Sequence, residues 1–173
     1  MQSSTFSGRA PRVFISYAWE DDHYREWVIS LCTQLRSDNI DVRLDKWHLE
    51  RGVTIPEFMN REVRLANIVL VLCSPKYRIK VHEMEERLRS TGAGWEAMLI
   101  GAKLFTTNIW EKIEVALARG VWAEAAPDFL LGLPYIDLSN GNEANYKLLK
   151  DRLAGCRQDA PILTRLPTTA NLL

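Results

Sequence analysis

The sequence predicts an α/β domain built around a central parallel sheet. Three apolar segments of strand length alternate with two segments of helical periodicity, and the connections between them are short. The third segment, Ile68–Cys73, is apolar at every position, which is typical of a strand buried on both faces of a parallel sheet. The length of 173 residues fits one domain.

The first half of the chain carries the regular strand–helix alternation. Residues 13–17 form a short apolar strand, and apolar side chains between positions 24 and 35 then recur at helical spacing. Residues 41–45 alternate polar and apolar side chains, which favours a strand near the sheet edge. A loop over 46–54 leads to a helix that starts near Pro56. The expected inner face of that helix consists of Ile55, Phe58, Met59, Val63 and Ala66.

The second half is less regular. Residues 76–90 are highly charged and predict a long, mobile excursion that contains some helix. The elements expected after it are a helix over 95–105, strands over 113–118 and 134–138, and a helix marked by Tyr146, Leu149 and Leu153. The domain therefore spans residues 12–155, with a flexible leader over 1–11 and a tail or linker over 156–173.

Composition limits the classes of function. Lys and Arg together number 22, as do Asp and Glu, and the resulting net charge of zero argues against direct binding of nucleic acid. No apolar stretch approaches the roughly 20 residues that a membrane span needs, and no signal core is present, which favours a cytoplasmic location without a membrane partner. Cys32, Cys73 and Cys156 form no CxxC pair, so neither a disulfide framework nor a metal site is expected.

Polar and aromatic side chains follow each of the first three strands. Ligands bind beyond the carboxyl ends of the strands in open parallel sheets, so these loops are candidates for a nucleotide-sized ligand site. Each loop is equally compatible with a plain solvated connection, because loops are polar by default. The loops contribute Ser16, Tyr17 and Trp19 after the first strand, Asp45 and Trp47 after the second, and Ser74 and Tyr77 after the third.

Absent motifs remove several enzyme classes, and one carboxylate stands out among the remaining groups. GxGxxG, GxxxxGK[ST], HExxH and GxSxG do not occur, and the three histidines lack metal-ligand spacing. Glu96 opens an apolar helix directly after Gly94 and Trp95, and the tryptophan is expected to exclude water and raise the pKa of Glu96. Glu96 is therefore either a catalytic group or a helix-start glutamate that interacts with the helix dipole.

Several motifs, taken in their order and spacing, resemble the TIR superfamily and especially its SEFIR-like bacterial branch. The resemblance implies a flavodoxin-like three-layer sandwich with a central parallel sheet of about five strands. The matching motifs are VFISY at 13–17 followed by Trp19, DKWHLERG at 45–52, the strand and Ser-Pro turn at 68–77, GWEAM at 94–98, RGVW at 119–122, PDFL at 127–130 and YIDL at 135–138.

The resemblance also implies one of two functions. Many bacterial and plant relatives cleave NAD+ at the nicotinamide–ribose bond, giving nicotinamide and ADP-ribose or a cyclic ADP-ribose, and here this activity would serve bacterial immune signalling after self-assembly. Other relatives are noncatalytic interaction modules. Either kind would self-associate through residues 47–54, which resemble the BB loop of this family, and would work with a sensor domain or protein. A nucleotide-binding receiver without catalysis is a weaker third interpretation, because no acidic pair with a lysine marks a phosphoacceptor site.

For NAD+ cleavage, the resemblance places the catalytic carboxylate at Glu96. The leaving nicotinamide is already cationic, so one carboxylate can suffice to stabilise the positive charge that develops on the ribose. NAD+ is then the substrate, and neither a cofactor nor a metal is expected. The expected substrate-binding residues are Ser16, Tyr17, Trp19, Asp45, Trp47, Arg51, Ser74, Tyr77 and Trp95.

The substrate-binding residues have separate expected roles. Trp47 or Tyr17 is expected to stack on a ring of NAD+, because aromatic faces suit planar rings. Ser16 or Ser74 is expected to reach a ribose or a phosphate with its hydroxyl group. Arg51 is expected to contact the pyrophosphate or, alternatively, a neighbouring subunit.

Overall fold

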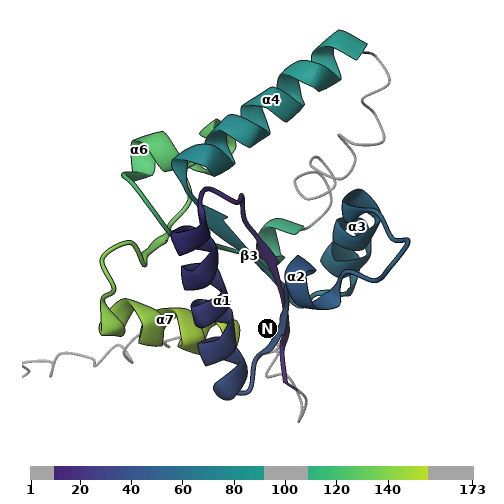
Figure 1. The fold of residues 1–173 in the computed structure, drawn as a ribbon. Coiled ribbons are helices and arrows are strands. Elements are labelled where there is room, and N and C mark those ends of the chain that lie inside the picture. The colour runs from purple at the N-terminus through teal and green to yellow at the C-terminus, as the bar shows by residue number, and fades with distance from the viewer. Residues whose placement is uncertain (1–9, 92–108, 156–173) are drawn as a thin grey trace, which may run out of the picture.

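Five parallel strands form one sheet in the order β2-β1-β3-β4-β5 within the part of the chain that the computed structural model describes, residues 10–91 and 109–155. The strands are β1 (Arg12–Ser16), β2 (Asp41–Arg43), β3 (Ile68–Cys73), β4 (Ile113–Leu117) and β5 (Ile136–Asp137). The sheet confirms the predicted flavodoxin-like topology (Figure 1). Most of the predicted leader, the whole predicted tail and the helix predicted over 95–105 lie outside the described residues.

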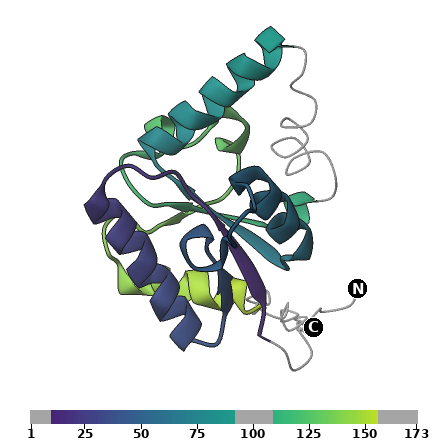
Figure 2. The same cartoon turned by 45° about the vertical axis from the view of Figure 1, so that its right-hand side comes forward.

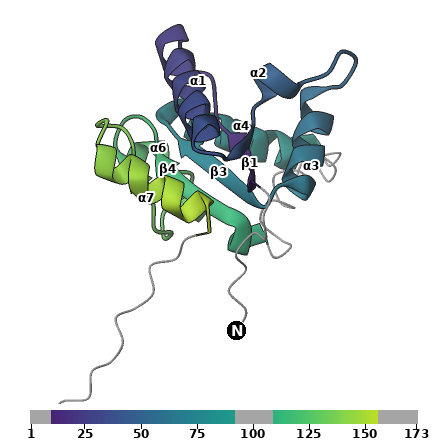
Figure 3. The ribbon, with the colours of Figure 1, turned by 90° about the horizontal axis from the view of Figure 1, so that it is seen from below.

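Helices connect successive strands, as the alternating sequence pattern predicts. Figure 3 shows α2 and α3 at the β1 end of the sheet and α7 at the β4 end. The α-helices are α1 (Asp22–Ser37), α2 (Asp45–His48), α3 (Ile55–Leu65), α4 (Pro75–Thr91), α6 (Trp122–Ala125) and α7 (Glu143–Leu153), and the 3₁₀ helices are η1 (Ile109–Lys112) and η2 (Asp128–Leu130).

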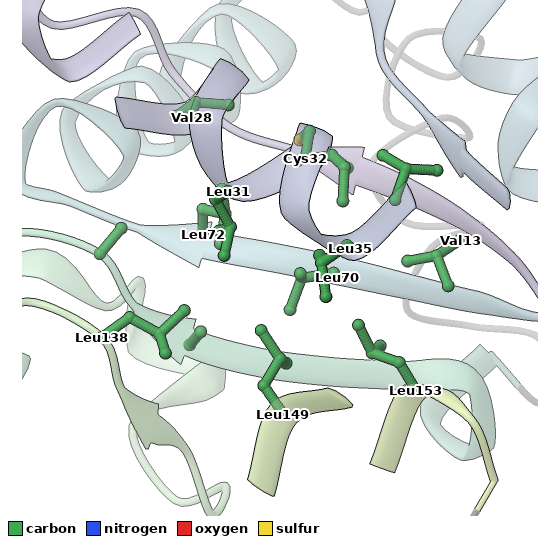
Figure 4. Packing of buried hydrophobic residues seen from close by; sticks show 14 of the residues in the cluster. Val13, Val28, Leu31, Cys32, Leu35, Leu70, Leu72, Leu138, Leu149 and Leu153 are labelled. Carbon is green, nitrogen blue, oxygen red and sulfur yellow. The ribbon is translucent and has the colours of Figure 1, made fainter. Parts of the chain in front are cut away.

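The sheet carries an apolar cluster on each face because the central strand β3 alternates between them. Leu70 and Leu72 pack with residues of α1 and α7, whereas Val69 and Val71 pack with residues of α3, α6 and η2. This alternation explains why β3 is apolar throughout, and it confirms the predicted three layers. Figure 4 shows the first cluster, in which the strand residues meet Val28, Leu31, Leu35, Leu149 and Leu153 from the two helices.

The short helix α2 begins at Asp45, so the strand predicted over 41–45 ends at Arg43, and the loop predicted over 46–54 starts within a helical turn. The backbone N–H groups of Trp47 and His48 both donate to the carbonyl oxygen of Leu44, which closes one helical turn. The prediction for Ile55 was also wrong, because this side chain is 54% exposed. Ile55 is the first residue of α3, and buried side chains begin only at Phe58, one turn into the helix.

The segment predicted as a mobile excursion over 76–90 is instead part of one continuous helix, α4. Ser74 precedes it and accepts a hydrogen bond from the backbone N–H of Tyr77 at 3.3 Å, and Pro75 suits the first helical position. The helix extends away from the rest of the described chain, as Figures 1 and 2 show. Its high charge therefore reflects exposure to solvent rather than a lack of structure, since Glu, Lys, Arg and Met are strong helix formers.

The described helices also bear on the expectation about membranes. None of them is both long enough and apolar enough to cross a bilayer. The most hydrophobic segment of the described chain, β3, is instead the central strand of the sheet. The apolar run in the sequence is therefore explained by burial within the domain.

Candidate functional site

The strand order places a topological switch point between β1 and β3. The chain moves from β1 outward to β2, then crosses back to β3 on the other side of β1. At such a point the connections leave the sheet in opposite directions, and the crevice between them is the usual ligand site of an open α/β sheet. The loops after β1, β2 and β3, which carry most of the predicted site residues, lie at this end of the strands.

Ser16, Tyr77 and Ser74 come together across the switch point. The hydroxyl oxygens of Ser16 at the end of β1 and Tyr77 in the first turn of α4 share a hydrogen bond of 2.9 Å. Ser74, fully buried, accepts from the backbone N–H of Tyr77. Burial raises the pKa of Tyr77 to about 12, so its hydroxyl group stays protonated and available as a donor at neutral pH.

A second hydrogen bond joins the loops after β1 and β2. The hydroxyl group of Tyr17 donates to the Asp45 carboxylate, which begins α2, at 3.1 Å. Burial raises the pKa of Tyr17, and the negative charge of Asp45 raises it further, so the phenol remains neutral and donates. Five predicted site residues are therefore gathered by hydrogen bonds that link three successive strand ends: Ser16, Tyr17, Asp45, Ser74 and Tyr77.

The remaining predicted residues within the described chain are more exposed. Trp19 is 52% exposed, and the guanidinium group of Arg25 lies over its ring at 5.9 Å from the centroid. Trp47 is 38% exposed, and its ring meets the ring of His48 edge-on with 6.2 Å between the two centroids. Arg51 is exposed on the turn before Gly52. The described chain shows no hydrogen bond that joins these three side chains to the five gathered residues.

Trp95 and Glu96 lie outside the described residues. Their predicted roles, including the catalytic role of Glu96, therefore stay predictions. Among the residues that are described, no group of three or more His, Cys, Asp or Glu side chains is arranged to hold a metal ion. Cys32 and Cys73 are buried free thiols, and burial raises the pKa of each to about 12, so neither has the character of a reactive thiolate.

Three residues that sequence reasoning missed hold together the loop after β1, the first turn of α4 and the loop after β4. One carboxylate oxygen of Glu20 accepts from the backbone N–H of Lys76 at 3.0 Å, and the other accepts from Arg119 at 3.3 Å. Arg119, which follows β4, also pairs with Asp21. Glu20 and Arg119 are 99 positions apart, so no local sequence signal connects them. We call the contacts of Glu20 with Lys76 and Arg119 the Glu20 clasp.

Asp21, beside the clasp, begins α1. Its carboxylate accepts from the backbone N–H of Tyr24 at 2.7 Å, which makes it the N-cap of the helix. This hydrogen bond and the one from Arg119 lower the pKa of Asp21, so the carboxyl group is ionised at neutral pH. The acidic cluster after β1 is thus used for capping and cross-linking, which the charge pattern alone only partly indicates.

Comparisons with known proteins give a consistent picture. A family model described as the TIR domain matches residues 13–150. A crystal structure of a prokaryotic SEFIR domain is similar, with a TM-score of 0.64 and 30% identity over 84% of this chain and 99% of that chain. The TIR domain of the Toll-related receptor TRR-2 from Hydra magnipapillata, at 20% identity, shares the fold with a TM-score of 0.55 over 82% of this chain and 96% of its own. No curated protein matches the sequence.

Proposed function

The chain belongs to the TIR domain family, and we propose that it cleaves NAD+ at the nicotinamide–ribose bond. The observation that carries this proposal is the hydrogen-bonded set of hydroxyl and carboxylate groups at the β1–β3 switch point, where this topology binds nucleotides. Hydroxyl groups and ring faces suit the riboses and bases of a dinucleotide. The neighbouring loops present Trp19 and Trp47 to solvent, which supports stacking on such rings.

The proposed reaction breaks the bond between the ribose C1′ atom and the nicotinamide ring nitrogen. The bonding electron pair returns to the ring nitrogen and neutralises its positive charge, so no general acid is needed for the leaving group. Positive charge then develops on the ribose, and a carboxylate held nearby stabilises it. Water adds at C1′ and releases a proton to give ADP-ribose, or a nitrogen of the adenine adds to give a cyclic product.

The residues of the chain take the roles that their chemistry allows. We assign the stabilising carboxylate to Glu96. Ser16 and Tyr77 offer hydroxyl groups to a ribose or phosphate, and Tyr17 or Trp47 offers a ring face. Because Ser74 and the N–H of Tyr77 bond to each other, and Glu20 takes the N–H of Lys76, the start of α4 is satisfied from within the chain. The substrate phosphates are therefore assigned to the other loops, with Arg51 as their cationic partner.

Nicotinamide release by the purified chain tests this proposal. We expect release from NAD+ at high protein concentration, and a loss of roughly 100-fold to 1000-fold on replacing Glu96 by Gln, the scale set by removing one group that stabilises transition-state charge. Glu83→Gln, an exposed carboxylate on α4, is the matched control and should retain wild-type activity. Thermal unfolding checks that both proteins are folded. Equal activity of Glu96→Gln and the wild type would then contradict the assignment.

A noncatalytic interaction module is the second candidate. The observation in its favour is a run of exposed apolar side chains at Trp47, Leu49 and Ile55, which is typical of an interaction surface. This candidate predicts self-association through residues 47–54 without nicotinamide release at any protein concentration. The same assay therefore separates the two functions, and assembly through this loop is part of both.

A further inference from the structure

The Glu20 clasp joins two loops and the first turn of α4 at the carboxyl end of the sheet. Glu20 belongs to the loop after β1, Lys76 to the first turn of α4 after β3, and Arg119 to the loop after β4. The Glu20 side chain is only 13% exposed, and its two oxygens bond to different partners from different loops. The ammonium group of Lys76 adds a contact with the backbone carbonyl of Glu20 at 3.5 Å.

The clasp lies directly beside the gathered site residues in the chain. Ser16 ends β1 and Tyr17 begins the loop that contains Glu20, and Tyr77 follows Lys76 in the same helical turn. The only other side-chain bond that the described residues show between the β1 loop and α4 is the one between Ser16 and Tyr77. Pairing of β1 with β3 sets Ser16 opposite Val71, and the clasp adds the contact that holds the loop after β1 against the first turn of α4.

We propose that Glu20 is a positioning residue of the reaction, acting by fixing the loop after β1 against the first turn of α4. This inference rests on the proposed NAD+ cleavage. Glu20 itself is satisfied by Lys76 and Arg119, so it acts through Ser16, Tyr17 and Tyr77 rather than by contact with the substrate. Without the carboxylate, the loop after β1 shifts against the first turn of α4, and the bound substrate loses its alignment for bond cleavage.

An ordinary surface ion pair would behave differently. Exposed pairs contribute little to stability, because solvent and salt screen them and because holding two long side chains together costs entropy. Here one partner is a backbone N–H at the start of a 17-residue helix, and the acceptor comes from a different loop. The bond to Lys76 therefore ties the backbone at the start of α4 to the Glu20 side chain, and Arg119 orients the carboxylate that accepts it.

Steady-state kinetics of three variants test the catalytic part of the proposal. Glu20→Ala should lower kcat by roughly tenfold to 100-fold, the scale expected when a small misplacement disturbs a positioned substrate, with a smaller change in KM. Glu20→Gln keeps an oxygen for the N–H of Lys76 and should recover most of the lost kcat. Asp22→Asn, which disrupts the exposed pair of Asp22 with Arg25 in the same acidic run, is the control and should match the wild type.

Hydrogen exchange tests the clasp without any need for activity. In Glu20→Ala the amide of Lys76 should exchange faster than in the wild type, while amides in the middle of α1 keep their protection. An unchanged Lys76 amide, or a kcat for Glu20→Ala equal to that of the wild type, would overturn the proposal. Absence of turnover in the wild type would instead overturn the proposed function, and the exchange measurement would then judge the clasp alone.

Discussion

Glu62 shows how a single residue in α3 ties the helix to two strands. Its carboxylate is fully buried and accepts from Arg12 of β1 at 2.6 Å and from Arg43 of β2 at 3.2 Å. Arg61 adds an ion pair at 3.6 Å. Helical periodicity places position 62 on the inner face, one turn after Phe58. The residue type predicts the opposite, because a glutamate side chain is usually exposed to solvent. Its partners lie 50 and 19 positions away, and the sequence pattern does not pair them.

Replacing Glu62 by Ala should lower the free energy of unfolding by about 3 kcal/mol, because it removes one partner of a buried ion pair and leaves two arginines uncompensated. The estimate takes the low end of the usual range, since Arg12 and Arg43 are partly exposed. Urea unfolding measures the change. Glu26→Ala, at an exposed glutamate of α1, should stay within about 0.5 kcal/mol of the wild type. A loss for Glu62→Ala no larger than that control would contradict the expectation.

The pH dependence of stability gives a second test of the role of Glu62. Burial acts to raise the pKa of its carboxyl group, but hydrogen bonds and charges from Arg12 and Arg43 outweigh burial and lower the pKa from its ordinary 4.5. The folded pKa thus lies below the unfolded one. The stabilisation is complete above the unfolded pKa and is lost as the pH falls through the folded pKa. The stability difference between the wild type and Glu62→Gln should therefore shrink as the pH falls below about 4.5.

Among the elements, α3 has the most complete helix start. Thr54 accepts from the N–H of Glu57 at 3.4 Å, and the Glu57 carboxylate accepts from the N–H of Thr54 at 2.9 Å, which forms a capping box. The hydrogen bonds that the Glu57 carboxylate accepts from the backbone N–H and the hydroxyl group of Thr54 lower the pKa of Glu57 and keep it charged at the helix N-terminus. The cap also fixes the end of residues 47–54, the loop proposed for self-association.

Thr54→Ala should lower the free energy of unfolding by about 1 kcal/mol, because the backbone N–H of Glu57 loses the side-chain oxygen that accepts its hydrogen bond. Thr33→Ala is the matched control on α1, where the exposed threonine bonds only to the carbonyl of Ile29 one turn earlier. That substitution should be neutral or slightly stabilising, since such a bond does not support the helix. Thermal unfolding of both variants makes the comparison, and equal effects would show that the capping box contributes nothing.

For the whole molecule, the parallel sheet and the two-sided core followed from patterns in the sequence, and the flavodoxin-like topology followed from the resemblance to the TIR superfamily. β3 was recognisable because a strand covered on both faces must be apolar at every position, and α1 because its inner face repeats at helical spacing. The helix α4 was not recognisable from its sequence, since a helix that extends into solvent needs no apolar stripe. Its structure comes from capping and propensity, which weigh less in a pattern search than apolar periodicity does.

The candidate site divides in the same way. The position of Ser16, Asp45 and Tyr77 near the carboxyl ends of the first three strands was predictable, because parallel strands bring those ends to one edge of the sheet. The bonds within the site were not predictable, because each joins side chains whose spacing in the sequence carries no periodicity. The Glu20 clasp is the clearest case, since Glu20 and Arg119 meet only after β1, β3 and β4 have assembled side by side.

Self-association of the protein should depend on the exposed segment over 47–54. Trp47→Ala removes the largest exposed apolar side chain of that loop, and a buried aromatic residue at an interface typically contributes about 2 kcal/mol or more. We therefore expect self-association to weaken by roughly thirtyfold, the factor that corresponds to 2 kcal/mol. Sedimentation velocity over a range of protein concentrations measures this change. Ile79→Ala, which is 55% exposed on α4, is the control and should assemble as the wild type does.

Activity measured on the same samples separates the two roles proposed for Trp47. If the ring acts through assembly, raising the concentration of Trp47→Ala restores complexes and nicotinamide release together, because the site itself is intact. If the ring stacks on the substrate, release stays low after assembly is restored. Unchanged sedimentation of Trp47→Ala would contradict assembly through this loop, because 38% of that side chain is exposed and an interface there would have to cover it.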